Sequence, residues 1–218
     1  MQAQDIARYL TEHADFFEQH PELLAGMQLP HPHSGQAISL AERQSMMLRE
    51  RIKALEARLA DMVRHGQEND AIADRLVLWS RSLLLATDTG DLPAVLVTEL
   101  EQVFNVPFAA VRLWCVQPDF SDLECARPVT GDTVTLANSM RLPFCGSNVG
   151  FEPASWLADA GAAKSLALLP LRVGAEPATF GLLVLGSPDK DRFQAAMGTA
   201  FLERIAELAS AALARLRG

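Results

Sequence analysis

The chain has 218 residues, of which 49% are hydrophobic and 21% are charged, so it can bury a core without a disulfide or a metal. Its 19 Lys and Arg residues against 27 Asp and Glu give a net charge of −8, and we expect no specific nucleic-acid binding because the basic surplus that neutralises phosphates is missing. Three cysteines, no signal-peptide pattern and no apolar run long enough for a bilayer predict a cytoplasmic protein without a membrane partner.

Residues 1–38 are predicted to form short helices followed by a loop. Apolar residues recur at helical spacing over residues 3–27, where Asp15 and Pro21 are suitable helix-start residues. Residues 28–38 contain two prolines, a serine and a glycine, which predict a break in regular structure.

Residues 39–88 are predicted to form one long helix that serves as a coiled-coil dimerisation arm. Ser39 and Glu42 match a capping box at its start. An apolar seam with spacings of 4, 3, 4 and 3 follows, made of Leu48, Ile52, Leu55, Leu59 and Met62. Arg51 and Glu56 flank the seam at positions that pair between the chains of a parallel dimer, so we expect a homodimer.

Two alternatives remain for this arm. The seam is shorter than three to four heptads, and it could instead pack against the N-terminal segment of the same chain. A polar run over residues 65–70 also interrupts it, so the helix could bend there or the coiled coil could end. Apolar spacing resumes at Ile72, and no proline intervenes, which favours one helix over two.

Residues 89–218 are predicted to form an α+β domain, with an antiparallel sheet flanked by helices. Pro93 stands in the first turn of a predicted helix. Strands are expected over residues 108–116, 123–129, 142–145, 165–173 and 179–186, the last two as a hairpin. One or two helical turns are expected over residues 153–158, and a final helix from Arg192 to the end.

Several stretches of this sequence resemble the bacterial domain-of-unknown-function family 484, a GAF-like family. The most specific are residues 20–24 (HPELL) and the run of residues 42–51 that contains ERQ and LRER. Weaker matches lie at residues 15–17, 29–31, 144–146, 168–171 and 181–187. The resemblance covers nearly the whole chain and implies a GAF-like fold, but it implies no established activity.

GAF relatives bind cyclic nucleotides, haem, bilins or small metabolites, or serve only for dimerisation. The sequence does not match the signature of the cyclic-nucleotide-binding members. The resemblance therefore leaves the cofactor unknown.

Motifs that carry chemistry are missing from the sequence. It contains no phosphate loop, dinucleotide loop, zinc-protease helix or serine elbow. All histidines precede the predicted domain: His13, His20, His31, His33 and His65. A nucleophile–histidine pair within the domain is therefore excluded, and we expect no enzyme. His31 and His33 lack further ligands nearby, so no metal site is predicted.

A ligand, if present, is expected between the sheet and the connection over residues 130–164, where the resemblance places the GAF cavity. The candidate binding residues are Arg112, Cys115, Arg127, Phe144, Cys145, Phe151, Trp156 and Leu168. The three rings would cover the cavity, the two cysteines and the leucine would form its floor, and one arginine would bind an anion. The alternatives are rings that fill the core, outward arginines, and either a core or a redox role for the thiol at position 145.

The sequence therefore favours a non-catalytic regulatory or sensory module that binds a small molecule and signals through a dimeric helical arm. The alternative is a structural or protein-interaction module whose pocket is filled. A homodimer is the expected assembly, and a small-molecule ligand and a protein partner are further candidates.

Overall fold

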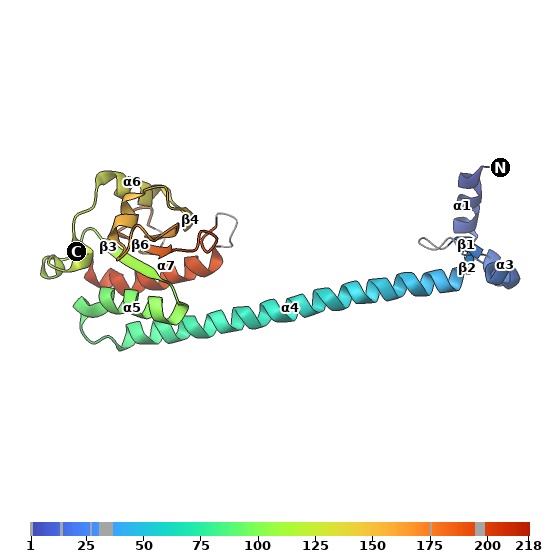
Figure 1. Cartoon of the computed structure of the whole chain (residues 1–218), viewed down its shortest axis with the longest axis horizontal. Coiled ribbons are helices and arrows are strands. Elements are labelled where there is room, and N and C mark those ends of the chain that lie inside the picture. The colour runs from blue at the N-terminus through green and yellow to red at the C-terminus, as the bar shows by residue number, and fades with distance from the viewer. Residues whose placement is uncertain (1, 14, 27, 31–36, 175, 195–198) are drawn as a thin grey trace. The chain divides into compact units, whose positions relative to one another are not determined.

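The computed structural model describes residues 2–13, 15–26, 28–30, 37–174, 176–194 and 199–218. The chain divides into two compact units, Met1–Asn69 and Asp70–Gly218. The division falls inside the helix α4, which spans Leu40–Leu85 (Figure 1).

The first unit contains three short helices, a two-stranded ribbon and the first part of α4. The helices are α1 (Ala3–Glu12), α2 (Phe16–Gln19) and α3 (Pro21–Gly26). Asp15 is the N-cap residue of α2 and Pro21 begins α3, so both predicted helix starts are confirmed.

The ribbon corrects the prediction of a loop over residues 28–38. Strands β1 (Gln28–Pro30) and β2 (Ala37–Ser39) pair antiparallel, with Leu29 opposite Ile38. A proline removes a donor from a sheet and is tolerated on an edge strand, and both strands of a two-stranded ribbon are edges. His31 and His33 lie outside the described residues.

Helix α4 runs without interruption for 46 residues, which confirms the prediction of a single long helix. Residues 65–70, the polar run within the seam, are helical like their neighbours. Gly66, Asn69 and Asp70 in this run are poor helix formers. The run contains no proline, however, so every residue keeps its backbone donor and the helix continues.

The second unit is built on a four-stranded antiparallel sheet, in the order β3 (Phe108–Leu113), β6 (Gly181–Ser187), β5 (Ser165–Leu171) and β4 (Phe144–Ser147). Three helices belong to this unit alone: α5 (Leu92–Phe104), α6 (Gly131–Ser139) and α7 (Ala200–Leu213). The unit also contains short 3-10 turns: η1 (Thr89–Asp91), η2 (Pro118–Phe120), η3 (Glu124–Ala126), η4 (Glu152–Trp156) and η5 (Ala214–Leu216). The predicted α+β class and the β5–β6 hairpin are confirmed.

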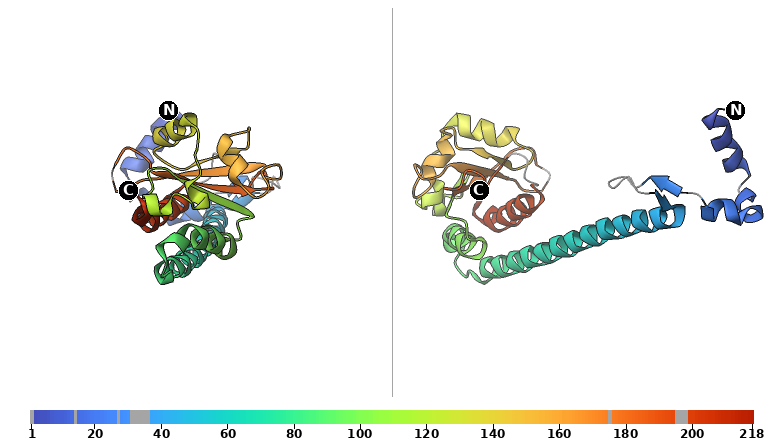
Figure 2. Two further views of the ribbon diagram at one scale, coloured as in Figure 1. Left: turned by 90° about the vertical axis from the view of Figure 1, so that its left-hand side faces the viewer. Right: turned by 45° about the vertical axis from the view of Figure 1, so that its right-hand side comes forward.

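Each face of the sheet is covered by different helices. Helices α5 and α7 lie on one face and α6 lies on the other (Figures 1 and 2). The first face buries Val111, Leu169 and Leu183 together with Trp79 from the end of α4. Because side chains alternate along a strand, Arg112 and its neighbour in β6, Leu182, belong to the second face.

Two element predictions in this unit were wrong, and one helix, α6, was not predicted. Residues 123–129 contain the turn η3 instead of a strand, and the carbonyl of Glu124 in this turn accepts a hydrogen bond from the Arg112 guanidinium. The connection before β4 contains α6, whose N-cap Thr130 accepts from the Thr133 N–H at 3.3 Å.

The final helix begins at Ala200 instead of Arg192. Residues 189–191, which precede this helix, form a turn around Asp189. The Asp189 carbonyl accepts from the Ser165 hydroxyl at 2.6 Å, and its carboxylate accepts from the Asp191 N–H at 2.9 Å. These contacts come from the tertiary fold and local turn chemistry, which override helical periodicity.

Candidate functional site

The sheet face under the predicted cover is filled with side chains. Leu166, Leu168, Leu182 and Val184 project from it and are fully buried against residues of α6, η4 and the chain that follows. A Cβ atom at Gly186 would lie 2.5 Å from Leu157 Cδ1, so the connection packs directly onto the strand. The space that the GAF resemblance assigns to a ligand is therefore occupied by core residues.

The predicted aromatic cover is divided between two places. Phe144 and Phe151 pack on each other with ring centroids 5.6 Å apart, and Phe144 remains 37% exposed. A Cβ atom at Gly146 would lie 2.9 Å from Phe144 Cζ, so this glycine makes room for the phenylalanine ring. Trp156 lies apart from this pair, beside Arg112.

The cysteines lie away from the predicted floor. Cys145 is buried on the opposite face of the sheet from Leu168, and burial raises the pKa of its thiol. A raised pKa opposes thiolate formation, which favours a core role over a redox role. Cys115 is exposed with a φ of +65°, and its carbonyl accepts from the Gly218 N–H at 2.9 Å.

The two arginines have different environments. Arg112 lies on the inward side of β3 and is only 9% exposed, with its Cζ atom 5.9 Å from the Trp156 ring centroid. Arg127 is not on a strand, its side chain is 69% exposed, and its contact is a carboxylate oxygen of Glu124 at 3.9 Å. Of the eight candidate residues, Phe144 packs on Phe151 and pairs with Leu168 between β4 and β5, whereas Arg112 and Trp156 come together separately.

These two residues line a pocket of about 420 Å³ along the outer edge of β3, a size usual for small-molecule sites. One wall comes from η1 and α5, with Gly90, Pro93, Ala94, Val97, Thr98 and Glu101. The opposite wall comes from Leu123 and from Glu124 and Cys125 of η3. Trp156 and Ala158 also line the pocket.

The α5 wall was missed in the sequence analysis, although the sequence contains a signal for it. Gly90, Ala94 and Thr98 recur every four residues and are small, whereas Leu92, Leu96 and Leu100 form the core face of the same segment. Only the tertiary structure shows that the face formed by these small residues lies beside the edge strand β3.

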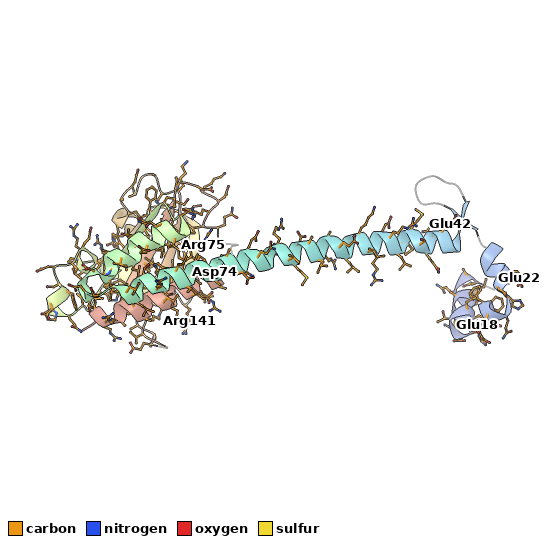
Figure 3. The ribbon with its side chains drawn as sticks, turned by 90° about the horizontal axis from the view of Figure 1, so that it is seen from below. Glu18, Glu22, Glu42, Asp74, Arg75 and Arg141 are labelled. Carbon is orange, nitrogen blue, oxygen red and sulfur yellow. The ribbon has the colours of Figure 1, made fainter. Side chains whose placement is uncertain are left out.

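A larger pocket of about 610 Å³ lies between α7 and β5. Its lining includes Arg172, but the guanidinium of this arginine already has hydrogen-bond partners within the chain. The Arg172 guanidinium donates to the carbonyls of Ala137, Asn138 and Met140, at the end of α6. Burial and the charge of Arg141, which Figure 3 labels, lower the pKa of Arg172. This arginine therefore fastens a helix end instead of facing a ligand.

The predicted dimerisation seam is exposed along its whole length. The exposed fractions are 60% for Leu48, 52% for Ile52, 55% for Leu55, 61% for Leu59 and 70% for Met62. Figure 3 shows side chains projecting from α4 all along this stretch. No described residue of the unit Met1–Asn69 covers the seam, so within this unit the seam does not pack against the N-terminal helices.

The fold thus defines an α+β unit that follows a long helix with an exposed apolar seam. The chain belongs to the family described as protein of unknown function DUF484, whose family model matches residues 1–217. The resemblance stated from the sequence is therefore confirmed. No curated protein matches the sequence.

The chain is also similar to several solved structures at low sequence identity. The GAF domain of a protein assigned as a sensor histidine kinase in Pseudomonas syringae pv. tomato is 19% identical, covers 70% of this chain and 91% of its own, and has a TM-score of 0.45. The GAF domain of Acinetobacter phosphoenolpyruvate-protein phosphotransferase is 14% identical, with coverage of 66% and 92% and a TM-score of 0.46. Free methionine-R-sulfoxide reductase from Neisseria meningitidis is 15% identical, with coverage of 66% and 88% and a TM-score of 0.44.

Two kinds of feature are missing from the described residues. They contain no group of three or more His, Cys, Asp or Glu side chains placed to hold a metal ion. Their helices include none with the length and apolarity needed to span a bilayer.

Proposed function

We propose that this protein is a non-catalytic regulatory module of the cytoplasm, in which two chains associate through the α4 seam and the α+β unit receives the regulatory signal. The single observation that carries the proposal is the exposure of five large apolar side chains at heptad spacing. The non-catalytic part is supported by the sequence, which has no histidine after His65.

The exposed seam calls for a covering partner. Burying one Leu, Ile or Met side chain stabilises an assembly by about 1.5–3 kcal/mol, and exposed apolar stripes of this kind usually mark an interaction surface. The seam residues lie on one side of the helix, because spacings of four and three return to the same face.

A second copy of the chain fits this surface best. In a parallel coiled coil each seam residue inserts between residues of the partner helix, and an identical chain supplies the same spacing in register. Arg51 precedes Ile52 and Glu56 follows Leu55, so opposite charges of the two copies flank the apolar centre. Such a pair favours the parallel register more than it adds affinity.

The test compares two double variants of the full chain. Ile52→Asp with Leu59→Asp places charges in the seam, whereas Ala54→Asp with Ala57→Asp places the same charges on the opposite side of α4. Alanine loses more helix propensity than isoleucine or leucine on this change, so the control is the harsher one for helix formation. Circular dichroism measures the helix content of both.

Sedimentation equilibrium at tens of micromolar then measures the mass. We expect the unaltered chain and the control to have twice the single-chain mass of 23.7 kDa, and the seam variant to be a monomer. An unaltered chain that is monomeric, or a seam variant that keeps the dimer mass, would overturn the proposal. Higher masses would assign the seam to a different assembly and would also overturn it.

The second candidate is a structural or protein-interaction module without a ligand. The filled sheet face supports it, because Leu166, Leu168 and Leu182 are fully buried where the resemblance places a cavity. Native mass spectrometry of the purified chain separates the two candidates. A bound small molecule supports the regulatory module, whereas a ligand-free chain that still dimerises supports the interaction module.

A further inference from the structure

We propose that the pocket along the outer edge of β3 binds a small monocarboxylate, with the Arg112 guanidinium as the group that holds the carboxylate. The site lies at the sheet edge and not on the filled face where the resemblance places a GAF ligand. It does not depend on the dimer proposed above, because every lining residue belongs to Asp70–Gly218.

The first argument is the incomplete pairing of Arg112. Its side chain is only 11% exposed, yet the carboxylate nearest to it, that of Glu124, comes no closer than 3.9 Å and is 76% exposed. The guanidinium donates to the Glu124 carbonyl, which carries no formal charge. A buried cation costs free energy unless a charged partner compensates it, and an arginine has five N–H donors arranged for a carboxylate.

The second argument is the open edge of the sheet. The Ala109 N–H donates to Glu101 Oε1 at 2.8 Å, which shows that odd-numbered residues of β3 turn their main-chain groups away from β6. Val111 shares this orientation because the pattern alternates. Its main-chain N–H therefore faces the edge along which the pocket lies, and offers a further donor for an anion.

The third argument is selectivity. Pro93, Ala94, Val97 and Leu123 supply an apolar lining for the body of a ligand. Glu101 also lines the pocket, so a dianion such as a phosphate monoester would meet more repulsion than a single carboxylate. The charge pattern thus favours one negative charge on an otherwise apolar molecule.

The experiment uses three probes with the same phenyl group. 3-Phenylpropionate has one carboxylate, 3-phenylpropanamide replaces it with a neutral amide, and phenyl phosphate is a dianion above neutral pH. Cys125 lines the pocket, and its alkylation reports on the site, although burial raises the pKa of its thiol and makes the reaction slow. Cys115 is exposed outside the pocket and serves as the reference. Mass spectrometry follows alkylation of both thiols by iodoacetamide above pH 8, and saturation-transfer NMR measures probe binding.

We expect 3-phenylpropionate to bind and to slow alkylation of Cys125 but not of Cys115, with weaker effects from the other two probes. Arg112→Lys keeps the charge but loses the two-pronged contact, and should weaken binding about tenfold. Ala94→Phe leaves Arg112 in place and fills the pocket, and should abolish both signals. Ala211→Phe, an exposed alanine of α7, is the matched control and should bind as the unaltered chain does.

The Ala94→Phe variant keeps the test decisive even if Arg112→Lys fails to fold. Equal binding of the amide and the carboxylate would overturn the proposal, because Arg112 would then have no role. Tighter binding of phenyl phosphate would overturn the monocarboxylate class. Unchanged protection of Cys125 in Ala94→Phe, or no binding of 3-phenylpropionate at millimolar concentration, would overturn the site itself.

Discussion

The two ends of helix α4 carry similar apolar patterns but are buried to opposite extents. Between Leu48 and Met62 every seam residue is at least half exposed. Near the other end, Trp79 is fully buried and Leu83 is 5% exposed, within the core of the second unit. The comparison shows that periodicity marks the apolar face of a helix, whereas burial depends on what covers that face.

The difference has a physical consequence for each end. At the Trp79 end the chain supplies its own cover, since the indole N–H donates to the Leu96 carbonyl at 3.2 Å and the ring lies 6.3 Å from that of Phe104. The seam has no such cover among the described residues of Met1–Asn69, and the proposed function assigns its cover to a second copy of the chain. Changes at one end should therefore act on folding, and changes at the other on assembly.

The largest effect is expected from Trp79→Ala. Removing a fully buried aromatic ring and its hydrogen bond should lower the free energy of unfolding by about 3–5 kcal/mol. Urea unfolding of the full chain, followed by far-ultraviolet circular dichroism, measures the loss. A loss below about 1 kcal/mol, the scale of an ordinary single substitution, would contradict the contrast between the two ends.

A smaller and concentration-dependent effect is expected from Leu55→Ala. In dilute solution the change should alter the free energy of unfolding by no more than about 0.5 kcal/mol, because Leu55 is 55% exposed within its own chain. At higher concentration the unaltered chain should gain thermal stability that the variant lacks, since association stabilises the folded state. Thermal scans over a hundredfold range of concentration measure this. A large loss in dilute solution would show that the seam is covered within one chain.

The smallest effect is expected on the pH dependence of the free energy of unfolding. It arises from Glu152 in the second unit and does not involve the seam. The Glu152 carboxylate accepts from the hydroxyls of Thr130 and Thr133, which lowers the pKa of this glutamate. Because the folded pKa lies below the unfolded one, the stabilisation is present above the ordinary glutamate pKa and is lost as pH falls through the folded value.

Acid titration of unfolding therefore distinguishes the unaltered chain from Glu152→Gln. The unaltered chain should lose stability below the ordinary glutamate pKa, and the variant should lose less over the same range. Thr135→Val, which changes a hydroxyl of α6 that bonds only within its own helix, is the control and should keep the acid slope. Equal slopes in all three chains would show that Glu152 contributes nothing measurable.

The sequence alone determined the elements with strong local patterns. The unbroken helix α4, the β5–β6 hairpin and the family resemblance all rest on runs of residues that are close together in the chain. Local periodicity is sufficient there, because a helix or a hairpin satisfies its backbone with neighbours. The seam residues were also recognisable, although their cover was not.

Only the tertiary structure decided where Arg112 lies and which residues join it. Its partners Glu124 and Trp156 are distant in sequence and come together because η3 packs on β3 and η4 packs on the neighbouring strand β6. Alternation along the predicted strand over residues 108–116 puts Arg112 and Val111 on opposite faces, but it does not say that both faces are covered. A buried charge is defined by contacts across the fold, and no local pattern of residues encodes them.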